Sequence, residues 1–380
     1  MDAATTGDIV FAAVVLARFV TPLFIPKFPL PAIVTALVLD AVDRDIFASF
    51  SNLDLTRYQG IDKSLDIFYL TVAMLSVLRN WTQPTAARTA RFLFYYRLVG
   101  VTAFELTGWR TLLLIFPNTF EYFFIFYELV RTRWSPERFS GRFYVVAAAA
   151  IWIFVKLPQE YWIHVAQLDF TDEVKERLFG VSADASWSEA VSNRPGVLVV
   201  LVLLAVGLVL AGRAWAHAVL GPPEHPLRLA ADPLPENIDE ARERAWLLSA
   251  HWRVLDANLA EKIVLVSLIS VIFGQVIPRV EATPLQLTLG VAVVATFNSV
   301  LTLRQARRER TIESAALSFT ILAVVNVLFV FMGDLLLRRS SGDLDVATTL
   351  FFLLLLTLLV TLYDRFRPVH DVRFLVTDQV

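Results

Sequence analysis

The chain has 380 residues, of which 56% are hydrophobic and only 18% are charged, and its mean hydropathy is +0.59. Soluble domains carry roughly a quarter of charged residues, and here the deficit falls in long apolar blocks, which indicates a lipid environment. The formal net charge of −2 provides no field that attracts nucleic acid, and the absence of cysteine excludes disulfides, thiolate metal sites and a cysteine nucleophile.

Eleven apolar stretches approach the length of about 20 residues that an α-helix needs to cross a bilayer. The first is expected to be retained, because Met1–Asp8 has no Lys or Arg and no signal cleavage site follows. We therefore expect an all-α polytopic transmembrane bundle in the cell membrane, in which residues 1–380 form a single integral membrane domain. The predicted spans are Ile9–Ile25, Leu30–Phe50, Gly60–Leu78, Phe92–Thr107, Arg110–Val130, Phe143–Leu157, Val197–Gly212, Lys262–Ile277, Pro284–Leu303, Ser314–Leu336 and Val346–Tyr363.

Two connections between spans are long enough to hold structure of their own. Residues 158–195 are expected to be an extracytoplasmic loop with a short helix, which begins at Thr171 and ends at Gly180. Residues 221–261 are expected to be a cytoplasmic loop that starts rich in proline and continues as a charged amphipathic helix over Ile238–Asp256. That helix is interpreted either as lying on the membrane surface or as a solvated connector.

The distribution of basic residues predicts the orientation, because cytoplasmic loops are enriched in Lys and Arg. With eleven spans, the side that holds the N-terminus has 11 Lys and Arg and the opposite side has 21, while Arg18 and Arg97 lie within spans. The turn Arg304–Arg310 alone contains four arginines. We therefore expect the N-terminus outside and the C-terminus inside.

The densest group of acidic residues flanks the second and third spans. Asp40 and Asp43 share one helical face, as do Asp62 and Asp66, and Lys63 lies beside them. Four carboxylates that converge without matched cations repel one another, and a divalent cation such as Mg²⁺ relieves that repulsion. The alternative is that they are interfacial residues at helix ends, paired with nearby basic side chains.

Other polar groups are predicted at the same outer side or within spans. Glu105 and Arg110 bracket the turn between the fourth and fifth spans, and Glu160 and His164 have a helical i, i+4 spacing that suits a weaker metal site. Glu121 lies near mid-bilayer among aromatic residues, where an acid must face protein or water. It is expected to pair with Arg18 or Arg97, or to contact a substrate or a proton. Glu128, near the inner end, is expected to form a surface ion pair with Arg131 or Arg133.

The spacing Asp40-x2-Asp43-x18-Asp62-x3-Asp66 resembles the motif of the CDP-alcohol phosphotransferase family, D-x2-D-G-x2-A-R-x8-9-G-x3-D-x3-D. The resemblance covers about 27 of the 380 residues. It implies that the aspartates hold a divalent metal and that one of them activates an acceptor alcohol.

Other positions of that motif differ in this chain. The family's two glycines and its Ala-Arg pair, which shape the cytidine-nucleotide site, are replaced here by Arg44, Tyr58, Phe47 and Ala48. The charge count also puts the aspartates outside, whereas CDP-linked donors are cytoplasmic. The chain is therefore not assigned to the family.

Three classes of function are compatible with these features. The favoured one is a membrane enzyme that acts on a lipid-phosphate or polyprenyl-phosphate substrate, with metal on the four aspartates, Asp66 or Glu105 as catalytic base, and Lys63, Arg110 and Glu121 as substrate-binding residues. An ion- or proton-coupled transporter or channel would use Glu121 and the aspartates along its path. A non-catalytic membrane scaffold would dock partners through residues 221–261.

Overall fold

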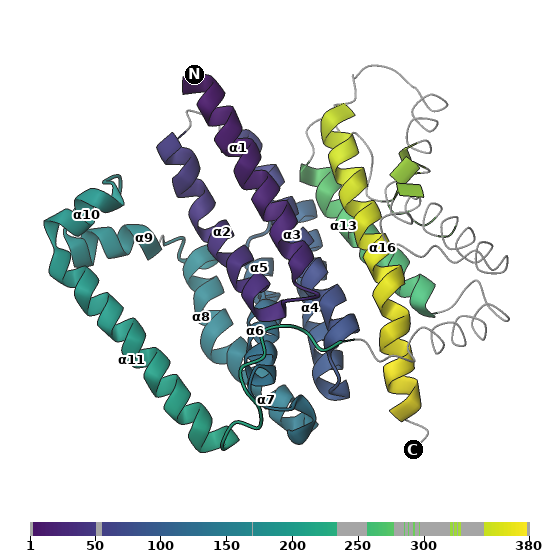
Figure 1. The fold of residues 1–380 in the computed structure, drawn as a ribbon. Helices are drawn as coiled ribbons and strands as arrows, with labels where there is room; N and C mark the ends of the chain where they lie inside the picture. Colours follow the sequence, from purple (N-terminus) through teal and green to yellow (C-terminus); the bar gives the residue numbers. More distant parts are fainter. Residues whose placement is uncertain are drawn as a thin grey trace.

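The protein is described from a computed structural model that covers residues 3–50, 55–168, 170–233, 257–276 and 346–377, with ten single positions between 285 and 327. Every regular element in these ranges is a helix, which confirms the all-α class (Figure 1). The N- and C-termini lie at opposite ends of the bundle. The predicted spans Pro284–Leu303 and Ser314–Leu336, the turn Arg304–Arg310 and the amphipathic helix at 238–256 lie almost entirely outside the described residues.

The helices follow one another along the chain with short connections. The first half comprises α1 (Ala3–Val20), the 3₁₀ turn η1 (Thr21–Phe24), α2 (Pro29–Phe50), α3 (Leu55–Asn80), α4 (Pro84–Thr107), α5 (Thr111–Ile115) and α6 (Thr119–Arg131). The second half comprises η2 (Pro136–Arg138), α7 (Gly141–Ala150), η3 (Ile151–Lys156), α8 (Leu157–Glu160), η4 (Tyr161–Val165), α9 (Phe170–Glu173), η5 (Val174–Phe179), α10 (Trp187–Asn193), α11 (Pro195–Leu220), α13 (Ala257–Val276) and α16 (Val346–Thr377).

Four helical segments are long and apolar enough to cross a membrane: Thr111–Arg131, Gly141–Val165, Pro195–Leu220 and Ala257–Gly274. Ile9–Phe24 is a shorter apolar helix. Helices of this length and composition indicate an association with membranes.

Helix α3 forms the centre of the bundle, where it packs against α1, α2, α4, α13 and α16. Most of its side chains from Ser64 to Asn80 are buried, as expected of a helix that neighbours cover on all sides. At its end, the fully buried Trp81 stacks on Tyr127 of α6, with 3.7 Å between the ring centroids. This contact fixes α6 against the centre of the bundle.

The predicted span Arg110–Val130 is broken in the structure. α5 ends at Ile115 and α6 begins at Thr119, because Pro117 cannot continue the hydrogen-bonding ladder. Side chains of α4 satisfy the freed carbonyls: Tyr96 donates to Ile115 O over 3.0 Å and Arg97 donates to Phe116 O over 2.9 Å. A polar interruption therefore lies inside an apolar segment, which is tolerated where protein covers it.

The predicted span Phe143–Leu157 is longer than expected. The helix continues through π-helical turns to Val165, so the first eight residues of the loop predicted at 158–195 are helical. The short helix in that loop is present as α9 and η5, and it ends at Gly180, whose φ of 70° is left-handed. The extension carries the buried Glu160 and the partly buried His164.

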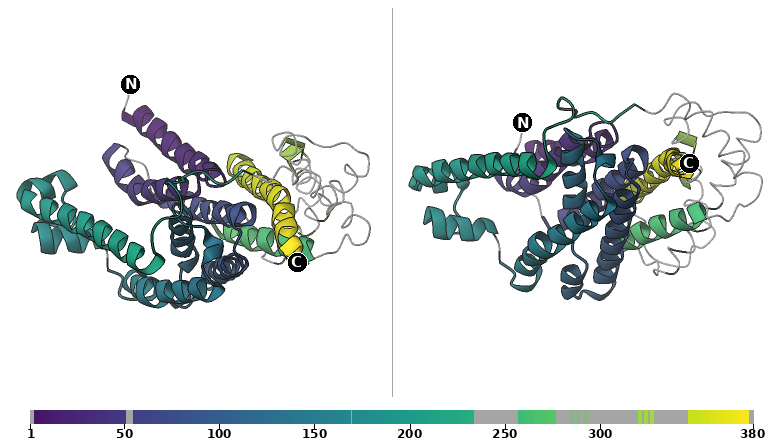
Figure 2. Two further views of the ribbon diagram at one scale, coloured as in Figure 1. Left: turned by 60° about the horizontal axis from the view of Figure 1, so that its bottom comes forward. Right: turned by 90° about the horizontal axis from the view of Figure 1, so that it is seen from below.

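Most of helix α11 lies away from the bundle, on the side opposite α16 (Figures 1 and 2), and its last turn packs against the bundle where Leu220 meets Val130 and Trp134. None of its 18-residue apolar window is buried, and Leu208 and Val209 are 73% and 71% exposed. At 26 residues it is about 39 Å long, more than the roughly 30 Å of a bilayer core. An apolar surface of this size is unfavourable in water.

Candidate functional site at the carboxylate cluster

Asp40, Asp43, Asp62 and Asp66 come together in the structure, as their spacing predicts. The first two lie on α2 and the other two on α3, and these helices pack against each other and against α1. Spacings of three and four residues place both carboxylates of each helix on one face. The cluster lies in the half of α3 that precedes its buried centre.

Arg18 of α1 lies among the four carboxylates. Its Nη1 donates to Asp43 and Asp62, and its Nη2 donates to Asp40 and, over 2.6 Å, to Asp66. The expectation that the aspartates lack a matched cation is therefore wrong. Sequence spacing did not reveal this partner, because Arg18 lies in another helix. The signal that was available is the arginine inside an apolar span, which indicates a buried ion pair.

The cluster has a buried floor and a more open rim. The side chains of Arg18 and Asp43 are 3% and 5% exposed, whereas those of Asp40, Asp62 and Asp66 are 32%, 36% and 39% exposed. One oxygen from each of these three rim carboxylates lies within 4.8 Å of the others. Oxygen ligands at such separations suit a hard divalent cation such as Mg²⁺ or Ca²⁺.

Outside the aspartate cluster, the predicted base Glu105 lies near the end of α4, and the predicted phosphate-binding residues Lys63 and Arg110 lie on α3 and in the turn after α4. Lys63 is half exposed and forms an ion pair of 3.0 Å with Glu105, and its ammonium lies over the ring of Phe104. Arg110 is exposed just before α5. Among the ion pairs of the described residues, neither Glu105 nor Arg110 contacts the aspartates.

Glu121 is buried at the start of α6, and its partners differ from those expected. Tyr69 donates to its Oε1 over 2.6 Å, and Asn118 Nδ2 donates to its Oε2 over 2.7 Å. The predicted pairing with Arg18 or Arg97 is wrong, because Arg18 contacts the aspartates and Arg97 contacts Glu160. Tyr69 lies three residues after Asp66 on α3, so the two side chains share a face.

Glu160 is the acceptor at the centre of a second polar group. His164 lies 2.9 Å from its Oε2, and Lys156 and Arg97 lie 3.8 Å and 3.9 Å from its Oε1. The backbone N–H of Asn118 donates to the same oxygen over 3.1 Å. Cations thus surround the carboxylate of the predicted Glu160–His164 metal pair, which disfavours a metal there.

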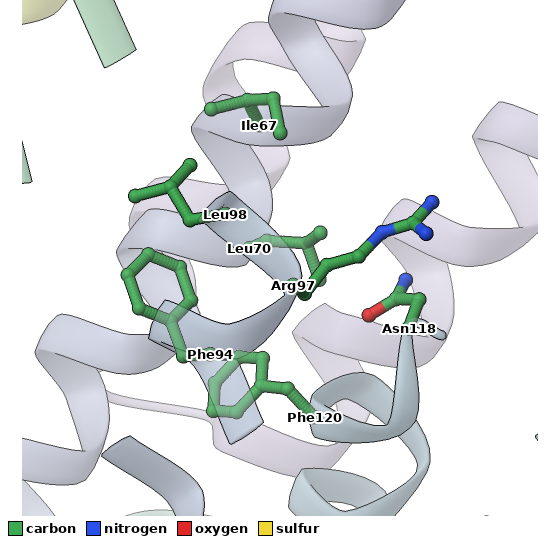
Figure 3. Close-up of a pocket in the computed structure, with 7 residues that line it drawn as sticks. All are labelled: Ile67, Leu70, Phe94, Arg97, Leu98, Asn118 and Phe120. Carbon is green, nitrogen blue, oxygen red and sulfur yellow. The ribbon is translucent and has the colours of Figure 1, made fainter. Parts of the chain in front are cut away.

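Asn118, at the break between α5 and α6, connects the polar groups around Glu121 and Glu160. Asn118 donates its side-chain amide to Glu121 and its backbone N–H to Glu160. Figure 3 shows Asn118 and Arg97 side by side at a cavity of about 10 Å³, which Ile67 and Phe120 also line. A hydrogen-bonded chain therefore runs from Tyr69 through Glu121, Asn118 and Glu160 to His164.

Comparisons with known proteins found no match among family models, curated proteins or solved structures. The likeness to the CDP-alcohol phosphotransferase motif remains a likeness of aspartate spacing.

Proposed function

We propose that the chain is a multi-pass integral membrane protein with eleven spans, its N-terminus outside and its C-terminus inside. The main support is α11, whose apolar surface has no cover from the described parts of the chain. Lipid is the solvent in which such a helix is stable. The excess of Lys and Arg on one side supports the orientation.

Within that frame, the protein is a metal-assisted enzyme that acts on a lipid-phosphate or polyprenyl-phosphate substrate at the outer leaflet. The observation that carries this proposal is the close approach of the Asp40, Asp62 and Asp66 oxygens on an accessible rim. Mg²⁺ is typically held by one or two carboxylates together with phosphate oxygens of the substrate. A rim of three partly exposed carboxylates provides those ligands and leaves room for the phosphate.

Arg18 has a positioning role in this proposal. Its guanidinium holds one oxygen of each aspartate, which fixes the carboxylates on two different helices relative to one another. A carboxylate has two oxygens, so each rim aspartate keeps an oxygen for a cation. The buried arginine therefore preorganises the ligands at a defined separation.

The ion pair of Lys63 and Glu105 couples the binding of a substrate phosphate to the activation of Glu105 as a base. Lys63 is half exposed and binds Glu105 in the free protein. A substrate phosphate that takes Lys63 as its partner releases the Glu105 carboxylate. This carboxylate, or Asp66 from the rim, then accepts a proton from a water molecule that attacks the phosphorus, the bond from phosphorus to the lipid oxygen breaks, and the lipid alcohol leaves with the proton returned from the base. Arg110, exposed beyond the end of α4, contacts the same phosphate.

The test uses the full chain in nanodiscs that contain a polyprenyl phosphate or a phospholipid, with consumption of that lipid followed by mass spectrometry. We expect consumption with Mg²⁺, none after EDTA, and a loss of at least tenfold in Asp66→Asn. Glu189→Gln, an exposed acid on α10, is the control and keeps the wild-type rate. Mg²⁺-independent turnover, or an Asp66→Asn rate equal to the control, contradicts the proposal.

A second candidate, a proton-coupled transporter, is favoured by the buried carboxylate of Glu121, which accepts hydrogen bonds from Tyr69 and Asn118. Glu121 is its central titratable group and is 4% exposed. In liposomes with an imposed pH gradient, this function predicts proton flux that Glu121→Gln abolishes. Equal flux in wild type, Glu121→Gln and empty liposomes excludes it.

A further inference from the structure

A second cavity lies at the far end of α3 from the aspartate cluster, and the candidate function does not use it. Its volume is about 80 Å³. Since one water molecule needs roughly 10–15 Å³, the cavity has room for several waters or one small anion. The residues that line it include Asn80, Arg131, Glu137, His225, Arg228 and Asp232.

Arg131, at the end of α6, is the central cation of this cavity and is 5% exposed. Its Nε donates to Glu128 over 2.6 Å, and its Nη1 donates to the carbonyl of Ala230 over 3.0 Å. Its Nη2 is buried and has no hydrogen-bond partner among the residues that the structure describes. A buried donor on a charged group is costly to leave unpaired, so this atom indicates a missing acceptor.

The outer wall of the cavity is a segment that is hydrogen-bonded to the bundle, residues 221–233. Glu224 N donates to Arg133 O and Arg228 N donates to Thr132 O, both over 3.0 Å. Ala231 N donates to Lys27 O over 2.8 Å. The side chains that this segment contributes, Arg228 among them, are therefore held in place by backbone contacts.

Positive charge dominates around the cavity. Arg131 and Arg228 line it. Two further arginines lie nearby: Arg79 is at the end of α3, and Arg373 donates to Trp81 O over 2.9 Å. Burial lowers the pKa of Arg79, and the neighbouring Arg373, Arg365 and Arg131 lower it further.

The acids near the cavity offset only part of this charge. Asp232 and Glu137 line it, and both are exposed to solvent, which screens them. Glu128 is fully buried, but Arg131 and Trp81 Nε1 occupy its two oxygens over 2.6 Å and 2.8 Å. The predicted ion pair of Glu128 is thus present, but in the interior instead of on the surface.

We propose that this cavity is a binding site for a phosphate group, which accepts hydrogen bonds from Arg131 Nη2 and from Arg228. A guanidinium binds phosphate oxygens strongly and directionally. The site lies on the side with the larger share of arginines, which is the predicted inner side. The phosphate comes either from solution or from the headgroup of an anionic lipid, whose leaflet lies on that side.

The test uses the full chain in nanodiscs of phosphatidylcholine, titrated with inorganic phosphate at constant ionic strength and followed by calorimetry. A parallel arm replaces part of the lipid with phosphatidic acid and records the unfolding temperature. Arg228→Gln is the main variant, because Arg228 is exposed and its removal leaves the buried Arg131–Glu128 pair intact. Arg142→Gln, an exposed arginine at the start of α7, is the matched control.

We expect saturable phosphate binding that Arg228→Gln weakens by about tenfold and Arg142→Gln leaves unchanged. A response to phosphatidic acid alone, with the same dependence on Arg228, identifies a lipid headgroup as the source. Arg131→Gln abolishes binding in either arm. Absence of a response in both arms, or equal effects of Arg228→Gln and Arg142→Gln, overturns the proposal.

Discussion

The Arg18 Nη2 atom of α1 donates to Asp66 Oδ1 of α3 over 2.6 Å, which joins the first helix to the centre of the bundle by a buried charge. The same guanidinium also binds Asp43 and Asp40 of α2. Three helices therefore share one electrostatic contact, and the geometry of the rim carboxylates depends on it.

Removal of that guanidinium is expected to destabilise the protein. In Arg18→Gln, four clustered carboxylates lose their shared partner, and breaking a buried pair costs about 3–5 kcal/mol. Because the three rim carboxylates are about one-third exposed, we expect about 3 kcal/mol, measured by unfolding in detergent.

The response of Arg18→Gln to Mg²⁺ shows whether its destabilisation comes from carboxylate repulsion or from lost packing. Without the arginine the carboxylates repel one another more, so Mg²⁺ is expected to raise the unfolding temperature of Arg18→Gln by more than that of the wild type. Arg18→Lys, which keeps the charge, is expected to show an intermediate loss. An Arg18→Gln protein as stable as the wild type would contradict this role.

Gly100 is the point where α4 approaches the helix break most closely. A Cβ at this position would lie 2.1 Å from Phe116 Cβ. Alanine favours a helix over glycine by about 1 kcal/mol, but overpacking costs about 1–3 kcal/mol, so we expect Gly100→Ala to be net destabilising. In Gly207→Ala on α11, where a Cβ meets no atom of the described residues within 4 Å, stability should be unchanged or slightly higher. Equal unfolding temperatures for the two variants would argue against this packing.

His370 of α16 makes stability depend on pH. Burial lowers its pKa from 6.5 to about 3, and the charges of Arg367, Arg91 and Arg373 act in the same direction. Below about pH 6.5, His370 is therefore protonated in the unfolded chain but stays neutral in the folded chain. Above pH 6.5 His370 therefore does not change the free energy of unfolding. As the pH falls from 6.5 towards 3, His370 lowers the free energy of unfolding by at most about 1.4 kcal/mol per pH unit.

The variant His370→Phe isolates that contribution. Phenylalanine preserves the ring contact with Phe374, whose centroid lies 4.5 Å from that of His370. Between pH 6.5 and pH 4, the free energy of unfolding should fall less steeply in the variant than in the wild type. Parallel pH profiles would show that His370 does not titrate on unfolding in this range.

The proposed orientation can be measured directly because the chain has no cysteine. A membrane-impermeant maleimide should label Asp184→Cys in intact cells, and should label Leu227→Cys only after permeabilisation. Leu208→Cys on α11 should remain unlabelled in both, because a thiol in lipid does not ionise to the reactive thiolate. The opposite pattern for Asp184→Cys and Leu227→Cys would reverse the topology.

Hydropathy and helix-end signals predicted the elements that depend on local sequence. The helical class, α11 and the short helix ending at Gly180 followed from apolar length and from single residues. The break at Pro117 was missed because the many apolar and aromatic residues of the segment keep its mean hydropathy high enough for one span, although Pro117 and Asn118 interrupt them. Proline was the available signal.

Long-range pairing was the part that the sequence did not reveal. Spacing alone placed Asp40 and Asp43 on one face and Asp62 and Asp66 on another, and these faces do meet. It did not predict that Arg18, 22 residues before Asp40, lies among them, nor that Glu121 binds Tyr69 instead of an arginine. A partner's identity depends on how helices rotate against one another, which periodicity does not determine.

The most direct test of the carboxylate cluster as a cation site is Mn²⁺ binding to the purified full chain in nanodiscs, followed by electron paramagnetic resonance. We predict one saturable Mn²⁺ site per chain that Mg²⁺ displaces. The double variant Asp62→Asn/Asp66→Asn loses it, and Glu189→Gln retains it. A double variant that binds Mn²⁺ as the wild type does, or a wild type without a saturable site, would contradict the assignment.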